Sequence, residues 1–144
     1  MDRYLGTFSD HVYAVLRMVS GFLILWHGSQ KLLNYPPQML APGTSNPGLS
    51  PLMAFGGTVE LVGGLLVMIG LFAGIAGFVV SGMMAVAYFM SHFSTAAFLP
   101  IVNRGELAVI YCFVFLYIAS RGSGIWSVDS LIRGRRTNIT RDSV

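Results

Sequence analysis

Six ionisable side chains stand within or at the ends of long apolar stretches of this sequence. They are Arg17, His27, Lys31, Glu60, His92 and Glu106. A charge near the centre of a lipid bilayer costs at least about 3 kcal/mol, so such a residue faces a bundle interior, a partner or water. A histidine beside carboxylates is suited to proton transfer near neutral pH. The set therefore indicates a site for proton handling or ligand binding inside a membrane.

The spacing of these residues predicts which of them meet. His27 and Lys31 are four residues apart and would share one face of a helix. Glu60 and Glu106 belong to other apolar segments, and we expect them to face that pair across a bundle. Arg17 belongs to the opposite half of the bilayer. The same charges could instead form a polar clamp that fixes the register of the helices, and both interpretations stay open.

The composition requires lipid around most of the chain. Of its 144 residues, 54% are hydrophobic and only 10% are charged, and the mean hydropathy is +0.68. A soluble domain carries roughly a quarter charged residues. The single cysteine, Cys112, has no partner for a disulfide or for a Cys-x-x-Cys redox site. Redox chemistry would therefore need a bound cofactor or a partner protein, and we expect no metal, haem or dinucleotide.

Four segments are candidates for membrane-spanning helices, which need about 20 residues each. We place them at about 12–33, 52–72, 74–92 and 101–121. Residues 52–91 would measure about 60 Å as one helix, twice the hydrocarbon thickness, so the chain must turn near 70–77. The fourth segment has only 14 uncharged residues in a row and reaches a spanning length only if Arg104 and Glu106 lie near an interface.

The distribution of basic residues predicts the orientation. Seven of the nine lie near the N-terminus or after the fourth segment: Arg3, Arg17, Arg121, Arg133, Arg135, Arg136 and Arg141. The positive-inside rule places both termini in the cytoplasm, as an even number of spans requires. The predicted fold is an all-α integral membrane protein, a bundle of four transmembrane helices with a basic cytoplasmic tail at 122–144. The N-terminus lacks a cleavable signal, so the first segment should remain in the mature protein.

Glycines repeat along the second and third segments. Gly56, Gly63, Gly70 and Gly77 recur every seven residues, and Gly57 and Gly64 stand beside the first two. Glycines on one stripe let helix backbones approach closely in lipid, where packing drives association. We expect a tight bundle along this stripe, although helices in lipid also tolerate glycine without such a role.

Three stretches of the chain together resemble the DoxX family of small bacterial four-helix membrane proteins. They are "RMVSGFLILWHGSQKL" from Arg17, "GGTVELVGGLLVMIGLFAGIAG" from Gly56 and "NRGELAVIYCFVFLYIASRGSGIWSVD" from Asn103. The resemblance spans most of the chain, and we identify 1–144 as a single DoxX-like membrane domain. Where the family usually has proline in the turn after the fourth helix, this chain has Ser123.

The resemblance implies a role in quinone-dependent redox chemistry at the bacterial inner (cytoplasmic) membrane. The chain would be a quinone-interacting subunit of a membrane-associated oxidoreductase complex, and it would carry no electrons itself. The candidate catalytic residues are His27, Lys31, Glu60 and Glu106, and the candidate quinone-binding set adds Arg17 and Asn103.

The expected partners are membrane lipid, quinone, and either another protein of the complex or a second copy of the chain. Nucleic acid is not among them, because the arginines at 133–136 follow the last span directly and are placed to bind anionic headgroups. The alternative function is a non-catalytic membrane scaffold or assembly factor whose polar residues only fix helix packing. A small transporter has less support, because no inverted repeat is visible.

Overall fold

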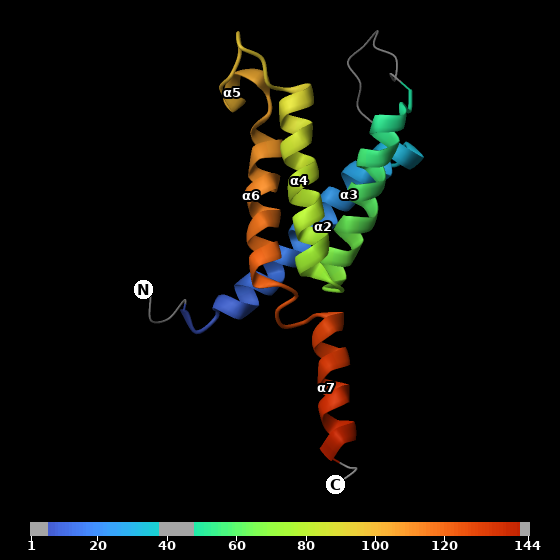
Figure 1. Ribbon diagram of the computed structural model, residues 1–144, viewed down its shortest axis with the longest axis vertical. Helices are drawn as coiled ribbons and strands as arrows, with labels where there is room; N and C mark the ends of the chain where they lie inside the picture. The colour runs from blue at the N-terminus through green and yellow to red at the C-terminus, as the bar shows by residue number, and fades with distance from the viewer. Residues whose placement is uncertain (1–5, 38–47, 142–144) are drawn as a thin grey trace.

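The chain forms a bundle of long helices with one further helix projecting from its end (Figure 1). The computed structural model describes residues 6–37 and 48–141, with side chains of the last helix described up to Gly134. The helices are α2 (Ser9–Leu33), α3 (Pro51–Ile69), α4 (Ala73–Ser91), α5 (Pro100–Asn103), α6 (Glu106–Arg121) and α7 (Val128–Arg141). We call the end of the bundle that carries α7 the α7 end and the opposite one the α5 end.

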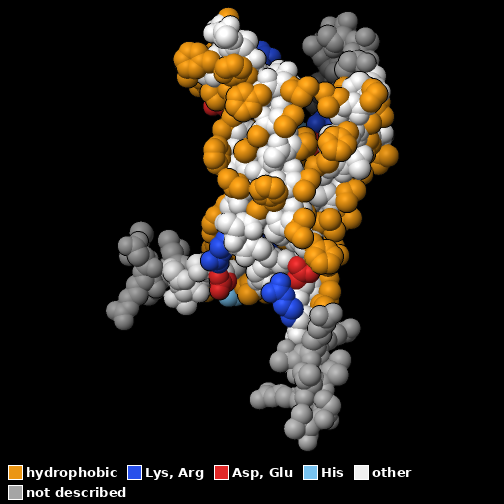
Figure 2. Space-filling model, viewed as in Figure 1, with side chains coloured by type: hydrophobic (Ala, Val, Ile, Leu, Met, Phe, Trp, Pro, Cys, Tyr) orange, Lys and Arg blue, Asp and Glu red, His pale blue; other side chains and the backbone are white. Residues whose placement is uncertain are grey.

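Three helices in the described part of the chain, α2, α3 and α4, are long and apolar enough to cross a membrane. Large apolar side chains cover the visible face of the bundle, as Figure 2 shows. Phe78 and Phe113 are among those that point outward. Water would not stabilise such a surface, whereas lipid would. The chain is therefore a multi-pass membrane protein with an all-helical described part.

The ends of α3 follow from local chemistry. Ser50 precedes the helix, and its hydroxyl accepts a hydrogen bond from the backbone N–H of Met53 at 3.2 Å, while Pro51 occupies the first turn. The helix ends at Gly70, whose φ of +72° lies in the left-handed region that glycine adopts without strain. The chain then turns directly into α4, within the region 70–77 where a turn was expected.

The closest helix contact joins α2 to α3 through glycines on both helices. A Cβ atom added to Gly21 would lie 2.5 Å from the backbone nitrogen of Met68, and one added to Gly64 would lie 2.8 Å from the carbonyl oxygen of Gly21. Two turns further along α2, a Cβ added to Gly28 would lie 2.6 Å from the carbonyl oxygen of Gly57 on α3. No larger residue fits without moving the helices apart, so these glycines set the register between α2 and α3.

The expected single glycine stripe is divided among several roles. Gly63 faces Val80 of α4, and Gly77 lies against the backbone of α6. Gly70 ends α3, and a Cβ at Gly56 would have only the sulfur of Met83 within 4 Å. The prediction of one shared contact stripe was wrong, because a helix with neighbours on two sides distributes its small residues between them.

The segment 101–121, expected as one helix, is divided into α5 and α6. Arg104 adopts a positive φ of 60° between them. The side-chain oxygen of Asn103 accepts a hydrogen bond from the N–H of Gly105 at 2.8 Å, which stabilises the break. The remaining helix α6 has 16 residues, about 24 Å, and runs antiparallel alongside α4 (Figure 1).

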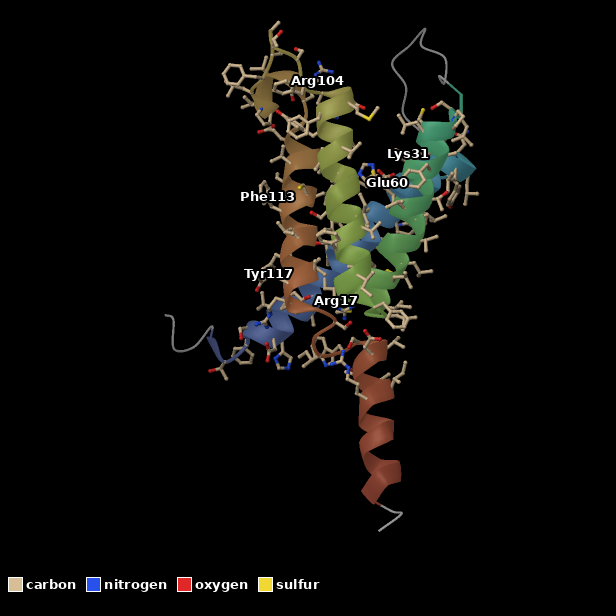
Figure 3. All side chains as sticks on the ribbon, viewed as in Figure 1. Arg17, Lys31, Glu60, Arg104, Phe113 and Tyr117 are labelled. Carbon is tan, nitrogen blue, oxygen red and sulfur yellow. The ribbon has the colours of Figure 1, made fainter. Side chains whose placement is uncertain are left out.

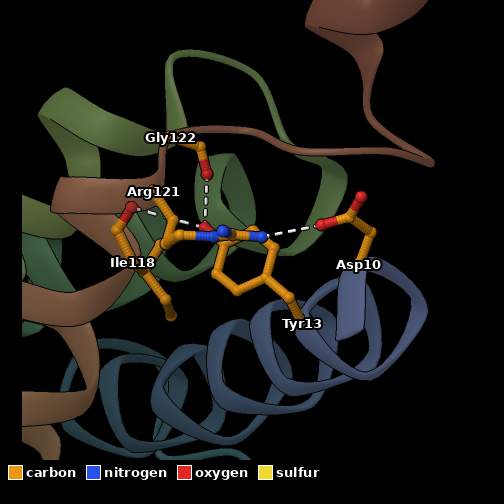
Figure 4. Close-up of polar contacts among 5 residues, drawn as sticks. All are labelled: Asp10, Tyr13, Ile118, Arg121 and Gly122. Carbon is orange, nitrogen blue, oxygen red and sulfur yellow. Dashed lines mark hydrogen bonds and ion pairs between the residues drawn. The ribbon is translucent and has the colours of Figure 1, made fainter. Parts of the chain in front are cut away.

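The α7 end is fastened by contacts between α2 and the end of α6 (Figure 4). The hydroxyl of Tyr13 donates to the carbonyl oxygens of Ile118, at 3.3 Å, and Gly122. Arg121 forms an ion pair with Asp10 at 2.7 Å. These contacts join the start of α2 to the end of α6, just before the segment that leads to α7.

The segment after α6 folds back against the turn between α3 and α4. The Asp129 carboxylate accepts hydrogen bonds from the N–H of Phe72 at 3.0 Å and from the hydroxyl of Ser123 at 2.5 Å. The hydroxyl of Ser123 therefore contributes a polar contact that a proline at this position could not make. The expected tail at 122–144 thus contains this docked segment and the helix α7.

Candidate functional site

A partly buried ion pair between α2 and α3 forms the centre of the site. The Lys31 Nζ atom lies 2.5 Å from Glu60 Oε1. Glu60 is 2% exposed, whereas the Lys31 side chain is 30% exposed and reaches toward the surface. Gly57 permits this pairing, because a Cβ there would lie 3.1 Å from the Cβ of Lys31. Figure 3 shows the two side chains together, in the half of the bundle nearer the α5 end.

The second oxygen of Glu60 is left without a partner. Glu60 Oε2 is buried and forms no hydrogen bond with any residue that the structure describes. Leaving a buried acceptor unsatisfied costs about 1–3 kcal/mol, and native proteins rarely tolerate this without a reason. A bound group with a hydroxyl or another donor would satisfy this oxygen.

Two aromatic residues complete the surroundings of the pair. The His27 ring packs edge to face against Tyr111 of α6, with ring centroids 6.2 Å apart. Tyr111 is buried. His27, Lys31, Glu60 and Tyr111 are called the polar cluster below. It gathers an acid, a base, an imidazole and a phenol from three helices.

Tyr111 was not among the predicted site residues. Its only signal in the sequence is a hydroxyl near the middle of the mainly apolar run "LAVIYCFVFLYIAS", where the other hydroxyls, of Tyr117 and Ser120, stand close to the end. A buried tyrosine hydroxyl usually finds a polar partner, so its position in the middle of that run could have marked it.

Arg17 lies far from the polar cluster, at the α7 end (Figure 3). Along α2 it is about 21 Å from Lys31. It is fully buried, and its guanidinium donates to the carbonyl oxygens of Val67 at 2.6 Å, Met68 at 2.8 Å and Trp126 at 2.8 Å. The first two carbonyls end α3, where a cation is favoured by the helix dipole. The geometry of Arg17 is that of a helix cap.

Asn103 organises the connection at the α5 end. Besides its contact with Gly105, its amide donates to the carbonyl oxygen of Ala97 at 3.0 Å and to the hydroxyl of Tyr88 at 3.3 Å. The carbonyl oxygen of Asn103 is 3.1 Å from Nδ1 of His92. Asn103 and His92 therefore hold the loop between α4 and α6 and are not part of the polar cluster.

Glu106 begins α6 with an exposed side chain. It forms no ion pair with any residue in the described ranges, and Lys31 pairs with Glu60 instead. A carboxylate at this position is favourable beside the helix N-terminus. The structure therefore pairs two of the predicted residues, Lys31 and Glu60, places His27 one turn from Lys31 on α2, and leaves Glu106 outside the cluster. No three His, Cys, Asp or Glu residues of the described part are placed to hold a metal ion.

An apolar groove adjoins the ion pair. It has a volume of about 440 Å³, lies between α3 and α4, and has Lys31 as the one charged residue in its lining. Figure 2 shows a basic side chain in the recess between these helices, at the place that Figure 3 labels Lys31. The site thus has a polar end within the bundle and an apolar side that opens toward lipid.

Comparison with known proteins places these residues in a family. The family model described as DoxX matches residues 12–93, which include Arg17, His27, Lys31 and Glu60. An uncharacterized protein of Haemophilus influenzae is 36% identical over 128 residues, covering 88% of this chain and 94% of that protein. No solved structure matches the chain.

Proposed function

Because the chain belongs to the DoxX family, we propose that it is a quinone-interacting subunit of a membrane-associated oxidoreductase complex. The observation that carries the proposal is the buried, unpartnered Glu60 Oε2 beside the Lys31 amine. The pair has no net charge, which suits a neutral head group with both hydrogen-bond acceptors and donors. Its position near an apolar groove suits a ligand dissolved in the membrane.

The residues of the polar cluster supply complementary hydrogen-bonding groups. Quinone and quinol interconvert by gaining or losing two electrons and two protons. Lys31 donates to a carbonyl oxygen, and Glu60 Oε2 accepts from a hydroxyl. His27 passes protons between this pair and the aqueous side. Electrons move to or from a protein partner, because Cys112 and the polar cluster contain no redox centre.

The proposed topology has four spans, with α6 as the fourth and both termini in the cytoplasm. Its support is the antiparallel packing of α6 on α4 and the exposed apolar residues along α6. The 24 Å of α6 are shorter than a hydrocarbon core of about 30 Å, and a local thinning of the bilayer or snorkelling of flanking residues accommodates this. We place the protein in the bacterial inner membrane.

A scaffold or assembly factor is the second candidate function. It is favoured by Arg17 and Asn103, which the structure uses for helix and loop contacts. In that case Lys31 and Glu60 would also act only as a clamp between α2 and α3. The two candidates differ in one measurable property, which is whether the purified protein retains quinone.

The test compares a glutamate-to-glutamine substitution inside the polar cluster, at Glu60, with the same substitution outside it, at Glu106. We expect wild-type protein, purified in mild detergent, to contain quinone in roughly stoichiometric amount, measured by organic extraction and mass spectrometry. Glu60→Gln should lower that content at least tenfold and keep the melting temperature within a few degrees. The fold should survive because the Lys31 amine left unpaired is partly exposed and can reach water.

Glu106→Gln is the matched control, because this carboxylate is exposed and outside the cluster. It should retain quinone like the wild type. Wild-type protein without quinone, or Glu60→Gln protein with undiminished quinone, would instead support the scaffold function.

A further inference from the structure

The groove between α3 and α4 is long in the direction of the membrane normal. On α4 its lining extends from Phe78 to Ser91, about 20 Å of helix. On α3 it extends from Leu52 to Val59. Its volume of about 440 Å³ lies within the range of small-molecule sites, about 300–1,000 Å³. An apolar groove that extends this far along α4 fits a hydrocarbon chain.

Two glycines keep this groove open. A Cβ added to Gly82 would have no atom within 4 Å, and one added to Gly56 would have only the sulfur of Met83, at 3.8 Å. These glycines therefore differ from Gly21, which a helix backbone touches directly. Close helix packing does not explain Gly56 and Gly82, whereas an occupant of the groove does.

The polar part of the groove defines the chemistry of that occupant. Lys31 is the one charged residue of the lining, and its charge is already balanced by Glu60. An anionic phosphate headgroup would find no free cation there. A neutral head with carbonyl oxygens can accept from the remaining Lys31 donors, and the unpartnered Glu60 Oε2 belongs to the carboxylate that Lys31 pairs with.

We infer that a quinone with a hydrocarbon tail enters between α3 and α4 from within the bilayer and leaves its tail in the groove. This inference rests on the proposed function and adds the route and the tail seat to it. Lys31 lines the groove and its amine pairs with Glu60, so a head group that enters along the groove meets the Lys31 amine without crossing the aqueous surface. The apolar lining, including Phe55, Val86 and Met90, receives the tail.

The test uses two probes that share one ring. One is a benzoquinone with a decyl tail, and the other is the same ring without the tail. Binding to the purified protein is followed by quenching of tryptophan fluorescence, corrected for detergent alone. Gly82→Leu places a side chain in the groove at a position where a Cβ meets no atom within 4 Å, and Val86→Phe fills the groove from a second position without adding a tryptophan. Ile110→Phe, at an exposed residue of α6 outside the groove, is the control.

We expect Gly82→Leu and Val86→Phe to weaken binding of the tailed probe at least tenfold and to leave binding of the ring within twofold. The Ile110→Phe control should bind both probes within twofold of the wild type. Unchanged binding of the tailed probe in the two filled variants would overturn the groove assignment while leaving the proposed function intact. Equal weakening of both probes would overturn the tail seat. A wild-type protein that binds neither probe would refute the proposed function itself.

Mass spectrometry of co-purifying lipids separates a phospholipid from a quinone as the natural occupant. The inference expects the filled variants to lose quinone and to keep the phospholipid content of the wild type. Loss of a stoichiometric phospholipid with quinone unchanged would overturn it.

Discussion

Replacing Arg17 with methionine tests whether this buried cation holds the fold or the ligand. The substitution removes three hydrogen bonds to backbone carbonyls. The Val67 carbonyl keeps the N–H of Gly70 as a partner, so two carbonyls, of Met68 and Trp126, are stranded. At about 1–3 kcal/mol for each stranded acceptor, the loss of stability is about 2–6 kcal/mol. The lower half of this range is expected, because the substitution also removes a buried charge.

Arg121→Met is the matched control, because the same residue type is exchanged at an exposed ion pair. Arg121 pairs with Asp10 at the surface and lies over the Tyr13 ring at 5.1 Å. Such contacts contribute about 1 kcal/mol. Unfolding of both variants in mixed micelles of mild detergent and dodecyl sulfate, followed by tryptophan fluorescence, measures the two losses.

Quinone content measured on the same samples completes the test. We expect folded Arg17→Met protein to retain as much quinone per molecule as the wild type, because Arg17 lies about 21 Å along α2 from Lys31. Equal stability of the two variants would refute the capping role. A stable Arg17→Met protein that had lost its quinone would place Arg17 in the binding site.

Two further predictions concern packing and topology. Gly21→Leu should prevent folding, because the leucine side chain would clash with the backbone of α3, whereas Gly82→Leu should fold. The yield of monodisperse protein measures the difference. Equal yields of the two variants would show that the close contact at Gly21 is not needed for folding. In a Cys112→Ala background, a membrane-impermeant thiol reagent on intact cells should label Thr95→Cys and not Gly134→Cys. Labelling at Gly134 would contradict the proposed cytoplasmic α7 end.

The membrane class and the long helices could be predicted from the sequence. Hydrocarbon thickness sets the length of an apolar helix, and the cost of unsatisfied backbone groups forces the helical form. Both constraints act on one segment at a time, so composition and length suffice to recognise it. The expected spans at 12–33, 52–72 and 74–92 correspond to α2, α3 and α4 within a few residues. The resemblance to the DoxX family is confirmed by the family match and the relative.

The pairing of charges could not be predicted in the same way. Helical spacing shows that His27 and Lys31 share a face of α2, but it does not give the rotation of α2 relative to its neighbours. The glycine contacts at Gly21 and Gly28 set that register, and they bring Lys31 to Glu60. Glu106 was an equally good candidate in the sequence, and only its position at the exposed start of α6 excludes it from the cluster.

Arg17 and Tyr111 show the same division between local and tertiary information. Nothing local to Arg17 reveals that it caps α3, because its acceptors lie about 50 and 109 residues away in the chain. Tyr111 joins the cluster because it packs against His27 of α2, a helix that is close to it in space but far from it in the sequence. The types of the polar residues and their presence in apolar helices are local properties that the sequence shows directly. Their partners depend on how separate helices pack against one another. The sequence of one helix does not specify that packing.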